Sequence, residues 1–277
     1  AACAGHPLVL LHAFPEAALA GRAAAPQLAR SFAVYAPDIP GYGESRIFDP
    51  TSYDFSKRGM ARDLRSLLND QGLLPVHLVG HDRGARIAYR FALDYPDDVR
   101  SLVVLGTVPN LTVAEATDYR LARAMYHWSF LAQPYPLPER LLEERAQFYI
   151  PYTIDSWAGS PNVIDEETMA EYIRAFSNPS VVHAACEDYR AGLGADLDYD
   201  RADRVAGAKI ACPVLAIWGS KTLGYVSDVV ALWSQWARHV EGLQVDSGHF
   251  VMEEQPQKTA EAIVRFCSGN TPTNPAQ

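Results

Sequence analysis

Short runs of apolar residues, bounded by turn or polar residues, recur along the chain. Runs of this length suit parallel strands that are buried on both faces of a sheet. Helix-length stretches with one apolar face lie between them. This alternation is typical of an α/β protein whose mostly parallel central sheet is flanked by helices. The predicted strands are residues 8–11, 32–36, 76–79, 102–105 and 214–218, and the predicted helices are residues 60–70, 85–94, 229–237 and 257–266.

The alternation stops over residues 107–206, where helix-length stretches rich in Tyr, Trp, Phe and Arg replace it. Because the strand pattern resumes at residue 214, we interpret this segment as a helical cap over the C-terminal strand ends, where α/β sheets bind ligands. The predicted core is residues 1–106 and 207–277, with a loose tail from residue 268. Prolines are expected to break the cap helices at Pro134, Pro136, Pro138, Pro151 and Pro161.

Composition narrows the function classes. The formal net charge is −9 and the Lys and Arg residues form no cluster, which argues against binding to nucleic acid or an anionic membrane. No apolar run approaches the ~20 residues of a membrane helix, and the N-terminus has no signal-peptide pattern. Four cysteines without metal-ligand spacing predict reduced thiols in a cytoplasmic protein with no metal; they are Cys3, Cys186, Cys212 and Cys267.

The sharpest chemical signal is the sequence Gly-His-Asp-Arg-Gly at residues 80–84, between a predicted strand and a predicted helix. Such a tight turn needs small residues two positions before and after its centre, and it presents the central side chain, here Asp82, to the site. A carboxylate can displace halide or open an epoxide at a saturated carbon, which leaves an alkyl-enzyme ester for water to hydrolyse. The alternative is a surface turn in which Asp82 caps a helix.

Two further motifs lie where this type of hydrolase needs them. His-Ala-Phe-Pro at residues 12–15 follows the first predicted strand, where a second backbone N–H would face the nucleophile, and we count Phe14 among the candidate substrate-binding residues. Asp-Ser-Gly-His-Phe at residues 246–250 follows a short predicted strand at residues 243–245. The order along the chain makes His249 the predicted general base.

These motifs and their flanks resemble the haloacetate dehalogenases, which remove fluoride or chloride from a 2-halocarboxylate and are related to the epoxide hydrolases of the α/β-hydrolase fold. The resemblance covers nearly the whole chain. It implies the α/β-hydrolase fold, a small-molecule substrate, no cofactor and a homodimer. The residues that carry it are 42–45, 57–58, 81–86, 126–134, 186–192 and 247–250.

The resemblance also implies roles for single residues. It makes Asp82 the nucleophile, gives Arg83 and Arg86 to the substrate carboxylate, and makes His127 and Trp128 donors to the leaving halide. Two guanidinium groups one helical turn apart would offset the repulsion between two carboxylates. The N–H donors would serve a halide or an epoxide oxygen equally well. The alternatives are arginines paired with acids and an aromatic pair that only packs.

One departure from the family concerns the acid that orients the base. Gly106 occupies the expected position, and residues 219–223, after the strand at 214–218, offer no carboxylate. Asp246, Asn110 or water would have to substitute. Without an orienting group, His249 would hydrolyse the ester more slowly.

A second departure places Gly194 where the family has a halide-pocket tyrosine. Its loss would weaken a fluoride site and enlarge the pocket. Tyr189, Tyr199 or Tyr225 would supply a hydroxyl instead, and Tyr189 is a candidate substrate-binding residue. Only seven residues precede Leu8, whereas this fold normally opens with an antiparallel strand pair, so we expect a truncated chain.

The leading hypothesis is a cofactor-independent dehalogenase of a small 2-haloacid, which the paired arginines favour. The second is an epoxide hydrolase that uses the same aspartate ester, which the two glycines favour. The third is a binding protein that kept the pocket and lost turnover together with its acid.

Overall fold

The computed structural model describes residues 5–222 and 228–270. Within them, six parallel strands form one sheet in the order β2-β1-β3-β4-β5-β6. This confirms the predicted α/β class with a mostly parallel sheet. The strands are β1 (Pro7–Leu11), β2 (Ala33–Tyr35), β3 (Val76–His81), β4 (Val99–Leu105), β5 (Val214–Gly219) and β6 (Val240–Val245).

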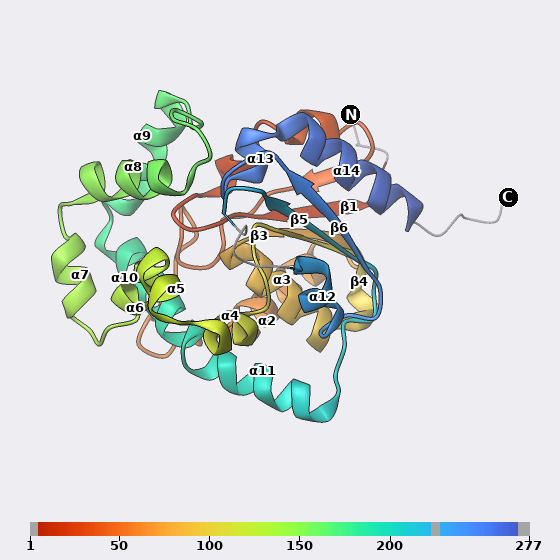
Figure 1. The fold of residues 1–277 in the computed structure, drawn as a ribbon, viewed down its shortest axis with the longest axis horizontal. Helices are drawn as coiled ribbons and strands as arrows, with labels where there is room; N and C mark the ends of the chain where they lie inside the picture. Colours follow the sequence, from red (N-terminus) through yellow and green to blue (C-terminus); the bar gives the residue numbers. More distant parts are fainter. Residues whose placement is uncertain (1–4, 223–227, 271–277) are drawn as a thin grey trace, which may run out of the picture.

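Helices cover both faces of the sheet (Figure 1). In β3, Leu78 joins the apolar cluster that includes α2 (Lys57–Asp70), α3 (Arg83–Asp94) and α12 (Val229–Ser234), whereas Val79 joins the cluster of α1 (Ala25–Leu28) and α14 (Pro256–Gly269) on the other face. Successive side chains of a strand point to opposite faces, so each buried strand contributes to both clusters. Short elements complete the core: η1 (Ala18–Gly21), η2 (Pro96–Asp98) and α13 (Val251–Glu254).

The segment between β4 and β5 is helical and extends beyond the sheet (Figure 1). One expectation for it was wrong, because Pro151 lies inside α8 instead of ending a helix. A proline removes one backbone hydrogen bond, and burial of the neighbouring Ile150 and Ile154 holds α8 together. The helices are α4 (Asn110–Ala116), α5 (Tyr119–Ala124), α6 (Tyr126–Leu131), α7 (Leu137–Leu142), α8 (Ala146–Trp157), α9 (Glu166–Phe176), α10 (Pro179–Gly192) and α11 (Ala195–Ala206).

Other differences from the prediction lie at helix ends. Helix α2 begins three residues earlier than predicted, at Lys57, because the side chain of Ser56 accepts a hydrogen bond from Gly59 N and caps the first turn. Helix α14 continues to Gly269, inside the segment predicted to be loose, and buries Phe266 and Cys267. No helix of the described residues is both long and apolar enough to cross a bilayer.

Buried ion pairs join the helical segment to the core. Arg90 of α3 pairs with Asp200 and Asp203 of α11, and Tyr89 donates to Asp200 at 2.9 Å. Lys57 of α2 pairs with Asp188 of α10. Removing one partner would leave a buried charge unpaired, which is strongly destabilising, so these pairs fix α10 against α2 and α11 against α3.

Candidate active site

The turn between β3 and α3 has the geometry of a nucleophile elbow. Asp82 has φ 45° and ψ −107°, a conformation that L-residues rarely adopt. A Cβ atom at Gly80 would lie 2.5 Å from Ala85 Cα, and one at Gly84 would lie 2.4 Å from Leu11 O. The backbone can pass this closely only with glycine at both positions. The backbone strain is therefore concentrated at Asp82.

The carboxylate of Asp82 is buried and carries a negative charge. Its side chain is nine-tenths buried, and in the described part of the chain its oxygens form no hydrogen bond. Burial alone would raise the pKa of Asp82. The charge that His249 carries when it is protonated, together with that of Arg86 and Arg83, outweighs burial, so the pKa lies below its usual range. Asp82 is ionised at neutral pH.

The two arginines beside Asp82 have different partners. Both guanidinium groups are buried. Arg83 forms a two-pronged pair with Asp188, from Nε at 2.7 Å and Nη2 at 2.8 Å. Arg86 donates to two neutral oxygens, those of Asn110 and Thr107, both at 2.8 Å, and its Nε lies 3.9 Å from Asp82 Oδ1. The charge of Arg83 is therefore neutralised, whereas Asp82 is the only carboxylate of the described residues that pairs with Arg86.

Several polar atoms around Asp82 are buried and have no hydrogen-bond partner in the part of the chain that the structure describes. Proteins rarely leave buried donors unsatisfied, because each costs about 1–3 kcal/mol. A cluster of them marks the position of a ligand. The unpartnered atoms are Arg83 Nη1, Arg86 Nε, His127 Nδ1, Tyr189 OH and His249 Nε2.

Aromatic side chains of the helical segment cover the arginines. The Trp128 ring lies over Arg86, 4.5 Å from its Cζ atom. The Tyr189 ring lies over Arg83 and contacts the rings of His127 and Phe14, with centroids 5.8 Å and 5.4 Å away. The predicted substrate-binding residues are thus brought together around one site. Burial lowers the pKa of His127 to about 3, so its imidazole is neutral there.

His249 lies in the loop after β6 and is fixed by its backbone. Its N–H donates to Trp157 O at 2.9 Å, and its carbonyl accepts a hydrogen bond from His81 Nε2 at 2.8 Å. Burial, followed by the charge of His81, lowers the pKa of His249 to about 4. The imidazole is neutral at physiological pH and can accept a proton from water.

The structure gives His249 no carboxylate partner within hydrogen-bonding distance in the described residues. Gly106, at the end of β4, has φ +63°. Asp246 is exposed and lies 3.4 Å from Lys221, so it does not orient the base. Asn110 is already bonded to Arg86 and to Gly192 O. Two of the three predicted substitutes are thereby excluded, and water remains.

The tyrosines predicted as alternative hydroxyl donors lie in different places. Tyr189 is in the site. Tyr199 packs under Arg58, 4.1 Å from its Cζ atom to the ring centroid. Tyr225 lies outside the described residues. Gly194 precedes α11, where a Cβ would lie 3.1 Å from the carbonyl oxygen of Arg190.

Sequence reasoning missed three groups. Trp157, from α8, contacts both His127 and His249, with ring centroids 4.4 Å and 5.5 Å away. Asp188 holds Arg83. Glu16 pairs with His81, whose ring packs on the ring of His249. Asp188 lies inside the stretch 186–192 and Glu16 directly follows the motif at residues 12–15, but their partners are far away in the sequence and only the fold reveals them.

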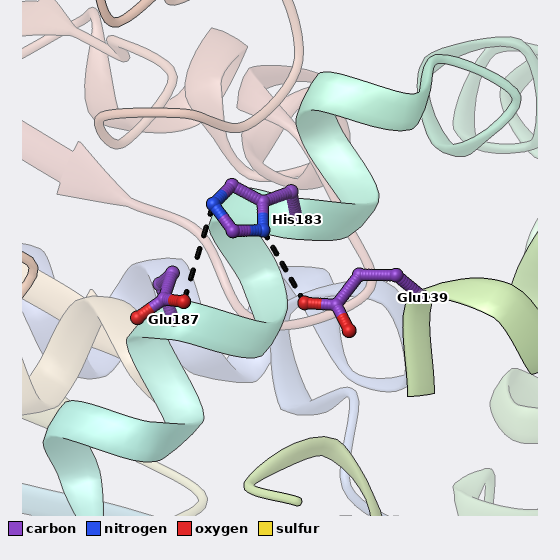
Figure 2. Close-up of side chains that lie close together, drawn as sticks. All are labelled: Glu139, His183 and Glu187. Atoms are coloured by element: carbon purple, nitrogen blue, oxygen red, sulfur yellow. Dashed lines mark hydrogen bonds and ion pairs between the residues drawn. The ribbon is translucent and has the colours of Figure 1, made fainter. Parts of the chain in front are cut away.

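Glu139, His183 and Glu187 form a further polar cluster between α7 and α10 (Figure 2). Their ligand-type atoms lie within 4.8 Å of one another, which is compatible with a metal ion. However, Arg190 Nη1 already lies 2.8 Å from Glu139 Oε1 and 2.7 Å from Glu187 Oε1. A guanidinium group thus supplies the positive charge, and we interpret the cluster as an ion-pair network that joins two helices.

Comparison with known proteins places this site in a family context. The family model described as "alpha/beta hydrolase fold" matches residues 6–256. A fluoroacetate dehalogenase from Burkholderia sp is 35% identical over 95% of this chain and 88% of its own. A soluble epoxide hydrolase from Corynebacterium sp. (strain C12) is also 35% identical, over 95% and 90%. A solved protein from Nostoc sp PCC 7120, named for the same fold, is 42% identical with a TM-score of 0.90, covering 95% and 90%.

Proposed function

The chain belongs to the alpha/beta hydrolase fold family, and on that premise we propose that it dehalogenates a small 2-haloacid through an ester on Asp82. Two relatives of equal identity, a fluoroacetate dehalogenase and an epoxide hydrolase, support a hydrolase with one of these two activities. The choice between them and the assignment of Asp82 rest on the site.

In the first step, a carboxylate oxygen of Asp82 attacks the halogen-bearing carbon and the halide leaves with the electrons of the carbon–halogen bond. The substrate carboxylate accepts hydrogen bonds from Arg86 Nε and Arg83 Nη1, which have no other partner. His127, Trp128 and Tyr189 donate to the leaving halide. The observation that carries this proposal is the charge of Arg86, which pairs with no carboxylate other than Asp82 within residues 5–222 and 228–270. Once Asp82 is esterified and has lost its charge, the carboxylate of an anionic substrate is the counterion of Arg86.

In the second step, His249 removes a proton from water and the oxygen attacks the carbonyl carbon of the Asp82 ester. The backbone N–H groups of Phe14 and Arg83 donate to no acceptor in residues 5–222 and 228–270, and they suit the oxygen that becomes negative. Collapse of this intermediate releases the 2-hydroxyacid and restores the carboxylate. The net reaction consumes one water and yields one halide ion and one proton.

The alternative is an epoxide hydrolase that forms the same ester. The hydroxyl of Tyr189 favours it, because this group is buried without a partner and can protonate an oxirane oxygen. Burial, with the charge of Asp82 next, keeps the pKa of Tyr189 well above its usual value, so the hydroxyl stays protonated.

The test is incubation with fluoroacetate, chloroacetate and styrene oxide in H₂¹⁸O, followed by mass analysis of the peptide that contains Asp82. Because water attacks the ester carbonyl, one labelled oxygen should enter Asp82 during repeated turnover. Label with halide release supports the dehalogenase, and label with diol formation supports the epoxide hydrolase. His249→Gln should stop at the ester, which adds the mass of the alkyl group to the same peptide. If wild type forms neither product, the proposed enzyme fails for this panel and the binding-protein hypothesis gains support.

We also propose a cytoplasmic homodimer. The three cysteines of the described residues are free thiols, which suits a reducing compartment. Helices α7 and α8 expose apolar side chains that suit contact with a second copy of the chain. These are Leu137, Leu141, Phe148 and Tyr152, and equilibrium sedimentation should give twice the mass of the chain.

A further inference from the structure

The base His249 is held through its backbone and not through its ring. Its N–H donates to Trp157 O, and its carbonyl oxygen accepts a hydrogen bond from His81 Nε2. Its ring packs on the ring of His81, with centroids 4.8 Å apart and planes inclined at 39°. The supporting group nearest to the base is therefore His81, the residue directly before the nucleophile.

His81 has an acceptor at each ring nitrogen. The carbonyl oxygen of His249 lies 2.8 Å from Nε2, and Glu16 Oε2 lies 3.3 Å from Nδ1. A carbonyl only accepts, and Glu16 Oε2 itself accepts a hydrogen bond from Ala13 N at 3.3 Å. An acceptor at each nitrogen favours the form of His81 that carries hydrogen on both, an imidazolium beside the Glu16 carboxylate. Burial opposes this charge, but Glu16 outweighs burial and raises the pKa of His81.

We propose that Glu16 and His81 are a positioning pair for His249, which takes the place of the carboxylate that Gly106 does not supply. His81 donates a hydrogen bond to the carbonyl oxygen of His249 and so fixes the loop that carries the base. The carboxylate of Glu16 stabilises the charged form of His81, and it supplies a buried negative charge near His249 when His249 accepts a proton. This inference rests on the proposed role of His249 as the general base.

The pair also contributes to keeping His249 neutral, next to burial, which is the main cause of its lowered pKa. The charged groups that face His249 are Asp82 from the turn before α3, Arg86 from α3, His81 from β3 and Glu16 from the loop after β1. His127 faces it from the helical segment and is itself neutral. His81 is the nearest cation and disfavours a second imidazolium, so the base stays unprotonated well below neutral pH.

The first test is an NMR titration of the ligand-free protein labelled with ¹³C at histidine Cε1, in which loss of one signal in His249→Gln assigns the base. We expect His249 to titrate near pH 4 in the wild type. In Glu16→Gln and His81→Gln the adjacent imidazolium is lost, so the pKa of His249 should rise toward the ordinary value of about 6.5. The rise should be larger in His81→Gln, because Glu16 remains charged. Glu115→Gln, which removes a glutamate of α4 that pairs with Arg204 of α11, is the control and should leave the signal unchanged.

The second test separates positioning from bulk structure by rapid-quench kinetics on chloroacetate and styrene oxide. His81→Ala should leave ester formation on Asp82 unchanged and slow ester hydrolysis at least about tenfold, so the ester accumulates. His81→Gln keeps a donor near the His249 carbonyl and should restore most of the rate of ester hydrolysis. In the pH profile of this rate, the fall on the acid side should occur at higher pH than in the wild type.

An unchanged His249 titration in both Gln variants, or equal ester hydrolysis in wild type and His81→Ala, would overturn the proposal. The titration needs no substrate. If the wild type forms neither halide nor diol, the proposed function fails while the titration still decides whether the pair acts on His249.

Discussion

At the scale of single residues, Arg86 separates the two proposed reactions. Arg83 and Arg86 look equivalent in the sequence, but Asp188 neutralises only Arg83. Burial lowers the pKa of Arg86, and the positive charge of Arg83 acts in the same direction. The negative charge of Asp82 opposes this shift but does not outweigh it. An anionic substrate relieves this imbalance and a neutral epoxide does not.

Arg86→Met should therefore abolish haloacid turnover and spare epoxide opening. Methionine keeps much of the apolar stem and removes the charge. A hydrogen bond to a charged group contributes about 1.5–3 kcal/mol, so kcat/KM on chloroacetate should fall at least about 10- to 100-fold. Arg58→Met, on α2 and half-exposed, is the control and should match the wild type on both substrates. Equal losses on chloroacetate and styrene oxide would show that Arg86 is structural.

At the scale of elements, the strand ends assemble the site and the sequence predicts most of them. Residues 76–84 combine an apolar run with two glycines, so the pattern predicts both the strand and the turn after it. All the predicted strands are present. Pro151 shows the limit, since local propensity predicts a break and tertiary packing keeps α8 continuous. The pairs Arg83–Asp188 and His81–Glu16 span 105 and 65 residues, and no local pattern encodes such distances.

The end of β4 gives a prediction that the sequence alone could not. Gly106 and Gly72 have similar dihedrals, φ +63° and +65°. A Cβ at Gly72 meets nothing within 4 Å, whereas one at Gly106 lies 3.1 Å from both His249 O and His81 Nε2. Gly72→Ala should lower the free energy of unfolding by about 1 kcal/mol, because alanine is strained in the left-handed backbone conformation. Gly106→Ala should lower it more, and it should slow ester hydrolysis because it disturbs the hydrogen bond that His81 donates to His249 O.

Urea denaturation of both variants at neutral pH measures the two costs. A Gly106→Ala protein that unfolds at the same urea concentration as Gly72→Ala would contradict this account of the β4 end.

At the scale of the whole molecule, buried groups with opposite pKa shifts set the pH range of stability. Burial lowers the pKa of His77 and of His249 to about 4, and that of His127 to about 3. Burial, with Glu16 next, raises the pKa of Glu253 to about 8. The histidines favour folding above their unfolded pKa of about 6.5, and this contribution is lost as the pH falls toward 4. Glu253 favours folding at low pH, and its contribution is lost as the pH rises through 8.

His77 tests this balance apart from the active site. It lies in β3, with Nδ1 2.8 Å from Ser101 Oγ and Nε2 buried without a partner. Its folded pKa lies below the unfolded value, so the wild type loses stability at up to about 1.4 kcal/mol per pH unit from this one group between pH 6.5 and 4. His77→Asn keeps a polar atom near Ser101 and does not titrate. We therefore expect the variant to have the lower free energy of unfolding at pH 7.5. The difference from the wild type should shrink as the pH falls to 4.5, as measured by urea unfolding at each pH. A gap of constant size would mean that His77 has the same pKa in the folded and unfolded chains, and that acid sensitivity arises elsewhere.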